Sequence, residues 1–483
     1  MVGMAHSAAD RRRRNGISEF RFLLRGRSGV WLAALLFIAL VRGMVYTFVI
    51  PPWQHPDEPS HFEHVRYIAE KGRLPAPDAV DLPIRREIVI SMRAYDYWPH
   101  GAPSLDDPAM TQPYGSPVGL STFVQPRLYY IAAAAWLRPW LGVAIEGQVY
   151  AARMFSVLLH LGLIAAGFLA VRVLYPENRS LAVAAGAFLA FLPGLTDIMS
   201  SINNDVLLNL EAALFFLLMA WIFRRGPRWR LNVAAIGLAI AAVFTKRTGV
   251  VLAGFLPIAW AAYLLRFRRG RVVAVVIVLL LLATVAGAVV FYSNAGDEAR
   301  PAIDAWFYRY FRAGLEQTLA NLVSAERQAV YLMTARIVFI SFWAAFGWRD
   351  VMLALPWYWI PLGATALAAL GLVVGEKLGR AVPRKARAWR ASFAVFAVLA
   401  VGLAWVAAIA RGQAYQGPTA YLSHGRYAYV AILPFAFLLV KGLQAWVPLP
   451  WRPASLWVFI LLVVSFDAVS FLGYLVPFYY PST

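Results

Sequence analysis

The sequence predicts an all-α protein that crosses a membrane about eleven times. Hydrophobic residues make up 61% of the chain and charged residues only 14%, whereas a soluble domain is about 45–50% apolar and 25% charged. Windows of roughly 20 apolar residues, the length that spans a bilayer as a helix, recur throughout the chain. The eleven candidate spans are residues 29–49, 150–174, 181–199, 205–223, 231–245, 249–265, 272–292, 356–375, 391–410, 426–444 and 454–476.

The segments between these spans carry the net positive charge of +20. Six of them hold 25 of the 45 Lys and Arg residues but only 4 of the 25 Asp and Glu residues. Cytoplasmic loops are enriched in Lys and Arg, so we expect a multi-pass membrane protein with a cytoplasmic N-terminus. Because orientation explains the charge, we exclude nucleic acid as a partner. The six segments are 1–28, 172–180, 224–230, 266–271, 376–390 and 441–453.

Two further apolar stretches do not fit as full crossings. Residues 128–140 are interrupted by Arg138 and Pro139, and residues 330–348 contain Arg336. Counting either stretch alone as a span would invert every later loop and place basic segments outside. We expect both to be interfacial or re-entrant helices on the outer side, buried in protein. The alternative is that both stretches span the membrane.

The alternation of spans leaves two large loops on the outer side. After Pro59, apolar residues such as Phe62 and Val65 recur with helical spacing, which predicts an amphipathic helix along the membrane surface.

The chain then divides into a basic cytoplasmic N-terminus (1–28), an N-terminal transmembrane module (29–292) with a large outer loop (50–149), a second outer loop (293–355) and a C-terminal transmembrane module (356–483).

An acidic pair lies just beyond the outer end of the first span. Asp57 and Glu58 are flanked by Pro56 and Pro59, which restrict the backbone on both sides. A carboxylate at the mouth of an apolar cavity has its pKa raised by desolvation, which suits a general base. The alternative is an acidic N-cap for the following helix.

Histidines surround this pair at positions 55, 61 and 64. Asp57, His61 and His64 can be assembled into a divalent-metal site, but their spacing matches no specific metal motif. The absence of cysteine excludes thiolate metal sites and cysteine nucleophiles. A metal therefore fits the sequence without being required, and no other cofactor is indicated.

Cations interrupt apolar sequence on the outer side. Lys246 and Arg247 lie in the middle of the apolar stretch 231–265, and Arg426 opens the tenth span. Cations against hydrocarbon are costly and often mark function, and a lipid phosphate is the obvious partner. Snorkelling to the headgroups is the alternative. Gly425 would let a ligand approach the backbone closely.

Two other features share the outer side. Asn203, Asn204 and Asp205 join two spans, either as a polar turn with an N-cap or as part of a site near Asp57. The aromatic run from Phe342 to Trp348 is typical of a membrane-interface belt. The same side chains are also suited to stacking against a sugar.

Taken in order, these motifs resemble a family of bacterial polytopic membrane proteins related to the GT-C glycosyltransferases. That superfamily includes the protein O-mannosyltransferases and the aminoarabinose transferase of lipid A. One departure is Gln125-Pro126-Arg127, where relatives often carry Lys/His-Pro-Pro. The motifs are Pro56-Asp57-Glu58-Pro59 with His61, Asn203-Asn204-Asp205, Thr245-Lys246, Phe342-Trp343 with Phe346-Gly347-Trp348, and Gly425-Arg426-Tyr427.

The resemblance implies a GT-C fold and a polyprenyl-phosphate-linked sugar as donor. The acceptor would be an extracytoplasmic hydroxyl of a glycan, lipid or protein, and the first-loop acid, Asp57 or Glu58, would be the base. A single displacement would invert the sugar. Lys246, Arg247 and Arg426 would bind the donor phosphate. The acceptor or sugar would contact His61, Asn204, Asp205, Tyr129, Trp348 and Tyr427.

Three alternatives remain. A non-catalytic polytopic scaffold would tolerate the loss of Asp57 and Glu58. A flippase or exporter of lipid-linked glycans would also need outer cations, but it would need a continuous hydrophilic path. The chain has few ionisable residues at mid-span depth, namely Arg42, Arg153, Glu211 and Asp467. A polymerase of surface glycans would differ from the proposed enzyme in using a diphosphate-linked donor.

Overall fold

The computed structural model describes most of the chain beyond its N-terminus. A few isolated positions near 23, 290 and 303 are also described. The predicted span 272–292 is described only in part, and the N-terminal 22 residues and most of 293–324 lie outside the described residues. The described ranges are 27–98, 101–113, 116–119, 121–267, 270–280, 325–378, 384–414, 420–421 and 423–481.

The fold is that of an all-α polytopic membrane protein, as predicted. Among the described residues, eight helical segments are long and apolar enough to cross a membrane. They comprise α2 (Arg27–Val49), α6 (Ile145–Leu174), α9 (Asp205–Arg225), η3 (Arg247–Gly249) with α11 (Val250–Leu264), α16 (Pro356–Leu378), α17 (Arg384–Ala410), η4 (Gly425–Ala431) with α18 (Ile432–Ala445), and η5 (Leu449–Trp451) with α19 (Arg452–Ser470), η6 (Phe471–Leu475) and α20 (Val476–Tyr479).

Three predicted spans account for the difference from eleven: one is broken, one is a short helix, and 272–292 is described only in part. Pro193 separates α7 (Arg179–Phe191) from α8 (Pro193–Met199), which are bent by 63° and count as a ninth span if they cross together. A proline has no N–H to continue the helical ladder. Helix α10 (Trp229–Thr245) has 17 residues, about 26 Å, which is shorter than the hydrocarbon core. By length it is not one of the eight segments, although it runs from the basic connector 224–230 to Lys246.

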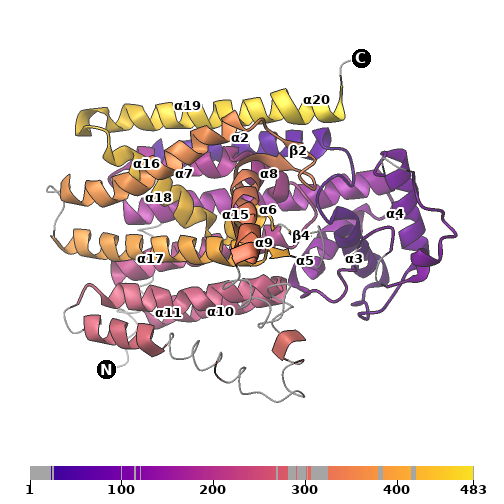
Figure 1. Cartoon of the computed structure of the whole chain (residues 1–483), viewed down its shortest axis with the longest axis horizontal. Helices are drawn as coiled ribbons and strands as arrows, with labels where there is room; N and C mark the ends of the chain where they lie inside the picture. Colours follow the sequence, from indigo (N-terminus) through magenta and orange to yellow (C-terminus); the bar gives the residue numbers. More distant parts are fainter. Residues whose placement is uncertain are drawn as a thin grey trace, which may run out of the picture.

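The basic connectors gather at one end of the helix bundle, as the alternation of spans predicts (Figure 1, left). Arg390 Nη1 lies 2.8 Å from Glu177 Oε1. Arg224 Nη1 donates to the carbonyl of Val173 at 3.1 Å, and Lys441 Nζ lies 5.1 Å from the centroid of the Tyr175 ring. We call this the basic end.

The first outer loop packs at the opposite end (Figure 1, right), which we call the outer end. Glu63 and Arg85 form an ion pair of 2.8 Å in which both side chains are buried. The first helix of the loop is therefore covered on more than one face, and the prediction that it lies along the membrane surface is wrong. The helices are α3 (Glu58–Lys71), α4 (Leu82–Ala94), η1 (Pro108–Thr111), α5 (Leu128–Leu137) and η2 (Arg138–Trp140).

The two stretches predicted as interfacial or re-entrant do not form long spans. Helix α5 ends after ten residues at the Arg138–Pro139 step. Helix α15 (Ala325–Ala344) runs across the other helices in Figure 1 and is not one of the eight apolar segments. It leads into a hairpin of β1 (Ala345–Phe346) and β2 (Val351–Met352), and a second hairpin pairs β3 (Gln413–Ala414) with β4 (Ala420–Tyr421).

Candidate active site

Asp57 occupies a strained backbone position at the start of α3. Its φ of 62° and ψ of 6° are left-handed, a conformation that non-glycine residues adopt rarely and mostly as Asp or Asn. It occupies the N-cap position, yet its side chain makes no capping hydrogen bond. Instead, Oδ2 lies 2.7 Å from Nη2 of Arg426, 369 positions along the chain. The local backbone thus turns this carboxylate away from its own helix.

Arg426 is positioned by tight packing against α15. A Cβ atom on Gly425 would lie 2.3 Å from the backbone nitrogen of Phe342, and the Gly425 N–H donates to Ser341 Oγ at 2.8 Å. Position 425 therefore admits only glycine because α15 touches it. The expectation that Gly425 makes room for a ligand is wrong. The Arg426 N–H donates to His424 Nδ1 at 3.0 Å, which fixes the start of η4.

Asp205 joins Asp57 and Arg426 from the first turn of α9. Its N–H is capped by Asn203 Oδ1 at 2.9 Å. Asp205 Oδ1 lies 2.6 Å from Lys246 Nζ, and Oδ2 lies 3.6 Å from Arg426 Nε. Four side chains from four separate parts of the sequence therefore meet at the outer end. We call Asp57, Asp205, Lys246 and Arg426 the outer cluster.

The outer cluster has polar atoms that its own members do not satisfy. Arg426 Nε and Nη1 are buried and have no hydrogen-bond partner among the described residues, and the same holds for Asp205 Oδ2. An unsatisfied buried donor or acceptor costs about 1–3 kcal/mol. The guanidinium thus retains donors for an additional acceptor, such as an oxygen of a bound anion.

Arg411, which the sequence reading missed, adds a third cation beside the outer cluster. Its guanidinium lies 4.2 Å from the centroid of the Tyr427 ring, and Lys246 Nζ lies 5.5 Å from the same centroid. Arg411 therefore brings a further positive charge to the side of the outer cluster, next to Tyr427. The sequence does contain a signal for Arg411: it is a lone arginine that directly follows the apolar stretch 391–410, on the outer side, where Lys and Arg are sparse.

The carboxyl group of Asp57 is accessible and ionised. About one third of its side chain is exposed (32%). Desolvation alone would raise the pKa of Asp57, but the attraction of Arg426, with smaller contributions from His61 and Lys246, outweighs it and holds the pKa below its ordinary value. The prediction of a raised pKa is therefore wrong, because it took no account of the neighbouring cations.

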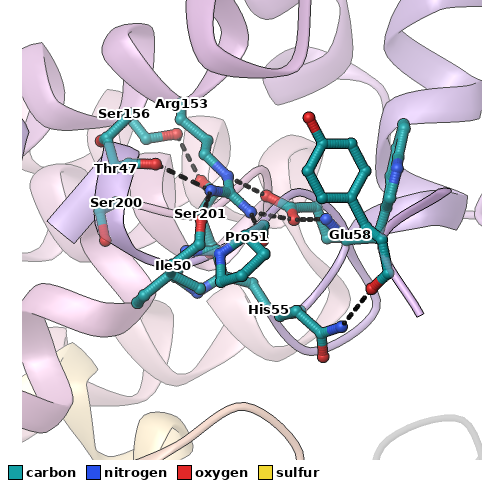
Figure 2. Close-up of polar contacts among 12 residues, drawn as sticks. Thr47, Ile50, Pro51, His55, Glu58, Arg153, Ser156, Ser200 and Ser201 are labelled. Atoms are coloured by element: carbon teal, nitrogen blue, oxygen red, sulfur yellow. Dashed lines mark hydrogen bonds and ion pairs between the residues drawn. The ribbon is translucent and has the colours of Figure 1, made fainter. Parts of the chain in front are cut away.

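Glu58 lies one residue further on but is closed off from any substrate. Its side chain is fully buried, and its oxygens lie 2.8 and 2.6 Å from Nε and Nη2 of Arg153 (Figure 2). Burial alone would raise the pKa of Glu58, but the charge and hydrogen bonds of Arg153 outweigh it and lower the pKa. This geometry contradicts a catalytic role for Glu58, whose carboxylate instead fixes the entry to α3.

Arg153 uses all its donors to hold the outer end of α2. Besides the pair to Glu58, Nη1 donates to the carbonyls of Thr47 and Ile50, and Nη2 donates to the carbonyl of Pro51, at 2.6 to 2.9 Å (Figure 2). The last carbonyls of a helix have no intrahelical partner. One guanidinium therefore ties α2, α6 and the start of α3 together.

His61 belongs to a hydrogen-bonded set behind Asp57. Its Nδ1 lies 2.8 Å from the hydroxyl of Tyr130, and Asn204 Nδ2 donates to that hydroxyl at 3.4 Å. His61 and Asn204 are thus brought together through Tyr130, and both side chains are buried. Their contact with an acceptor stays a prediction. Tyr129, the tyrosine chosen from the sequence, is fully buried and cannot contact a substrate.

The structure does not support the metal site considered from the sequence. His64 Nδ1 lies 3.3 Å from Thr122 Oγ1, and its ring stacks on Tyr130 at 3.8 Å. His61 contacts the hydroxyl group of the same tyrosine. Within the part of the chain that the structure describes, no group of three or more His, Cys, Asp or Glu side chains is arranged to hold a metal ion. Asp57, His61 and His64 therefore do not form such a group.

The remaining predicted contacts divide between the cluster and its surroundings. Tyr427 lies among the cations, with the Arg426 guanidinium 5.4 Å from its centroid. Arg247 turns away and donates to the carbonyl of Val124 at 3.0 Å, so it does not join the outer cluster. Trp348 is 50% exposed in the β1–β2 turn, whereas Phe342 and Trp343 are core residues. Of these aromatics, only Trp348 retains a surface for stacking.

The two histidines should make the outer end sensitive to acid. Burial lowers the pKa of His61 to about 4 and that of His64 to about 3, from an ordinary value of 6.5. Their contribution to stability is therefore complete above pH 6.5 and is lost as the pH falls through the lowered values, because the unfolded chain binds more protons. We expect the melting temperature in detergent to fall between pH 6.5 and pH 4.

The replacement His64→Phe, which keeps an aromatic ring against Tyr130, should make that fall smaller. Tryptophan fluorescence during heating measures it, with both proteins compared at pH 7.5 as the reference. Equal losses of melting temperature in the two proteins would show that His64 does not supply the acid sensitivity.

The comparisons with known proteins find structures but no sequence relatives. No family model and no curated protein matches the chain. An apo crystal structure of the Archaeoglobus fulgidus oligosaccharyltransferase is 12% identical with a TM-score of 0.45, over 91% of this chain and 56% of that one. AglB from the same organism, in complex with an inhibitory peptide and a dolichol-phosphate, is 12% identical with a TM-score of 0.43, over 91% and 55%.

A third structure, apo ArnT from Cupriavidus metallidurans, is 15% identical with a TM-score of 0.33, over 92% of this chain and 78% of that one. All three are GT-C glycosyltransferases. The chain spans about half the length of the two oligosaccharyltransferase structures. Because the TM-scores lie below 0.5, we base the proposed function on the site residues.

Proposed function

We propose that the protein is a membrane glycosyltransferase. It would move a sugar from a polyprenyl-phosphate-linked donor to an acceptor hydroxyl at the outer end. The observation that carries this proposal is the outer cluster. It combines an ionised, partly exposed carboxylate with a guanidinium that has unused donors, beside apolar spans that a lipid-linked donor can reach.

In the proposed reaction, Asp57 accepts the proton of the acceptor hydroxyl while that oxygen attacks the anomeric carbon. The bond from this carbon to the phosphate oxygen breaks, and the polyprenyl phosphate leaves with the electron pair. A single displacement inverts the configuration. General-base assistance contributes typically about 10²–10⁴-fold.

Arg426 and Lys246 would stabilise the growing negative charge on the phosphate. Removing one such donor from a preorganised site costs about 10²–10³-fold in rate. Arg411 would add its positive charge beside Tyr427, whose ring also lies near Lys246. With the basic end cytoplasmic, the chemistry would take place on the extracytoplasmic face of a bacterial inner membrane.

Transport of lipid-linked glycans is less well supported by the membrane-embedded charges. Arg42 and Asp467, which could have lined a hydrophilic path, pair with each other, with Nε and Oδ2 2.6 Å apart. Arg153 is fully used by Glu58 and backbone carbonyls. These groups therefore serve the packing of helices.

The proposal predicts which cation the reaction depends on. Proteoliposomes containing the protein and a panel of radiolabelled polyprenyl-monophosphate sugars should yield labelled acceptor from a membrane extract. Arg426→Gln should lower the initial rate about 10²-fold, whereas Arg86→Gln, which removes an exposed cation of the first outer loop, should leave it unchanged. Transport of labelled lipid without transfer would favour a flippase, and use of diphosphate donors alone would favour a polymerase.

A further inference from the structure

A second charged site lies at the basic end, opposite the outer cluster. Helices α16 and α17 both pack against α18, which lies between them in Figure 1. A cavity of 560 Å³ opens between them. Its lining includes four cationic side chains, Arg387, Arg390, Lys441 and Arg452.

The described lining of this cavity carries these four cations and no carboxylate. Glu177 lies next to the cavity, where it pairs with Arg390 at 2.8 Å and attracts Lys441. Lys441 Nζ has no hydrogen-bond acceptor in the described ranges and lies over the Tyr175 ring. Arg390 Nε is buried without a described partner. The cavity therefore holds an excess of positive charge with unused donors.

The rest of the lining is apolar and continues to the outside of the bundle. Leu372 of α16 and Phe437 of α18 line the cavity. Val398 and Leu399 of α17 also line it and are about half exposed (50% and 49%). In a membrane-spanning bundle, exposed apolar side chains of this kind face lipid. The cavity thus joins a cationic inner part to a wall that acyl chains can contact.

Close packing of α16 against α18 defines one side of the cavity. A Cβ atom on Gly371, which lines the cavity, would lie 2.1 Å from the carbonyl oxygen of Gly442. Helices α16 and α18 therefore touch through two glycines. Such small residues let membrane helices approach closely. The cationic side chains of α17 and α18 face the space that remains.

We propose that this cavity binds a phospholipid with an anionic headgroup from the leaflet at the basic end. Its phosphate would accept hydrogen bonds from Lys441, Arg390 and Arg452, and its acyl chains would lie along Val398 and Leu399. Basic pockets between transmembrane helices bind anionic headgroups in this way. The site lies at the other end of the bundle from the outer cluster, so this proposal does not depend on the proposed sugar transfer.

Native mass spectrometry of the full-length protein in detergent tests this proposal. Phosphatidylglycerol, added after delipidation, should bind more tightly than phosphatidylcholine. The double replacement Lys441→Gln/Arg452→Gln should weaken phosphatidylglycerol binding about 30-fold, since each cation near a membrane surface contributes about 1 kcal/mol. The double replacement Arg228→Gln/Arg230→Gln, which removes two cations from an exposed connector at the same end, should leave binding unchanged.

A charge-preserving pair, Lys441→Arg/Arg452→Lys, keeps the test decisive if the glutamine variant unfolds. It should bind phosphatidylglycerol within about threefold of the unaltered protein. Equal binding of the two lipids, or an equal loss in the Arg228→Gln/Arg230→Gln control, would overturn the proposal. The proposal would also be overturned if inorganic phosphate alone stabilised the protein as much as phosphatidylglycerol does, because the cavity would then bind a free anion.

Discussion

Replacing Asp57 with asparagine should lower the rate of sugar transfer about 10²–10⁴-fold, the usual contribution of a general base. Asparagine is nearly isosteric and, like Asp, tolerates the left-handed backbone at this position. The fold should therefore survive. What is lost is the carboxylate that faces Arg426 and reaches the surface. The measurement is the initial rate of transfer in proteoliposomes at saturating donor.

Two controls separate chemistry from packing. Asp57→Glu should restore part of the rate because it restores the carboxylate, and Asp78→Asn removes an exposed acid of the same loop and should have no effect. Melting temperatures of all three variants should lie within a few degrees of the unaltered protein. Full activity of Asp57→Asn would remove this residue from the reaction.

The second large effect concerns stability. Arg153→Met should destabilise the protein by about 3–5 kcal/mol, because it leaves Glu58 as an unpaired buried charge. It also removes the donors to the final carbonyls of α2 at Thr47 and Ile50. Reversible unfolding in mixed micelles, followed by circular dichroism, measures the change in the free energy of unfolding.

The matched control is Arg138→Met, which removes an exposed arginine of η2 at the same end. It should change the free energy of unfolding by less than about 1 kcal/mol. The double variant Glu58→Gln/Arg153→Met should recover part of the loss, because no charge is then left buried without a partner. A single Arg153→Met variant as stable as the unaltered protein would mean that Glu58 is not held as described.

The position of the site could be predicted from the sequence, because charge and hydropathy act over whole segments. Alternation of apolar spans and basic connectors brings Asp57, Asp205, Lys246 and Arg426 to one end, and the structure places these four side chains together. This prediction needs no backbone angles. Two signals were sufficient: the prolines on both sides of Asp57 and Glu58, and the cations that interrupt apolar sequence on the outer side.

Choices between adjacent residues could not be made from sequence. Asp57 faces outward and Glu58 inward because the backbone is left-handed at Asp57. No sequence pattern predicts this backbone conformation. In the same way, Tyr130 rather than Tyr129 meets His61 because of the rotational phase of α5. The lowered pKa of Asp57 depends on Arg426, whose side chain arrives from a distant part of the sequence.

Segment boundaries depended on tertiary packing in the same way. Helix α3 has the apolar stripe of a surface helix, yet its charged face is also buried because Arg85 of α4 pairs with Glu63. The apolar stretch 181–199 reads as one span, but the chain bends at Pro193 so that α8 packs against α15 and η4. Hydropathy records how apolar a segment is and does not record which neighbour covers it.

An experimental structure of the protein in a lipid nanodisc with a bound polyprenyl phosphate would test the donor site at the outer cluster. We expect the phosphate oxygens to lie within hydrogen-bond distance of Arg426 and Lys246, with the carboxylate of Asp57 facing them across the space for the sugar. A phosphate bound elsewhere, with Arg426 and Lys246 still paired only to Asp57 and Asp205, would contradict it.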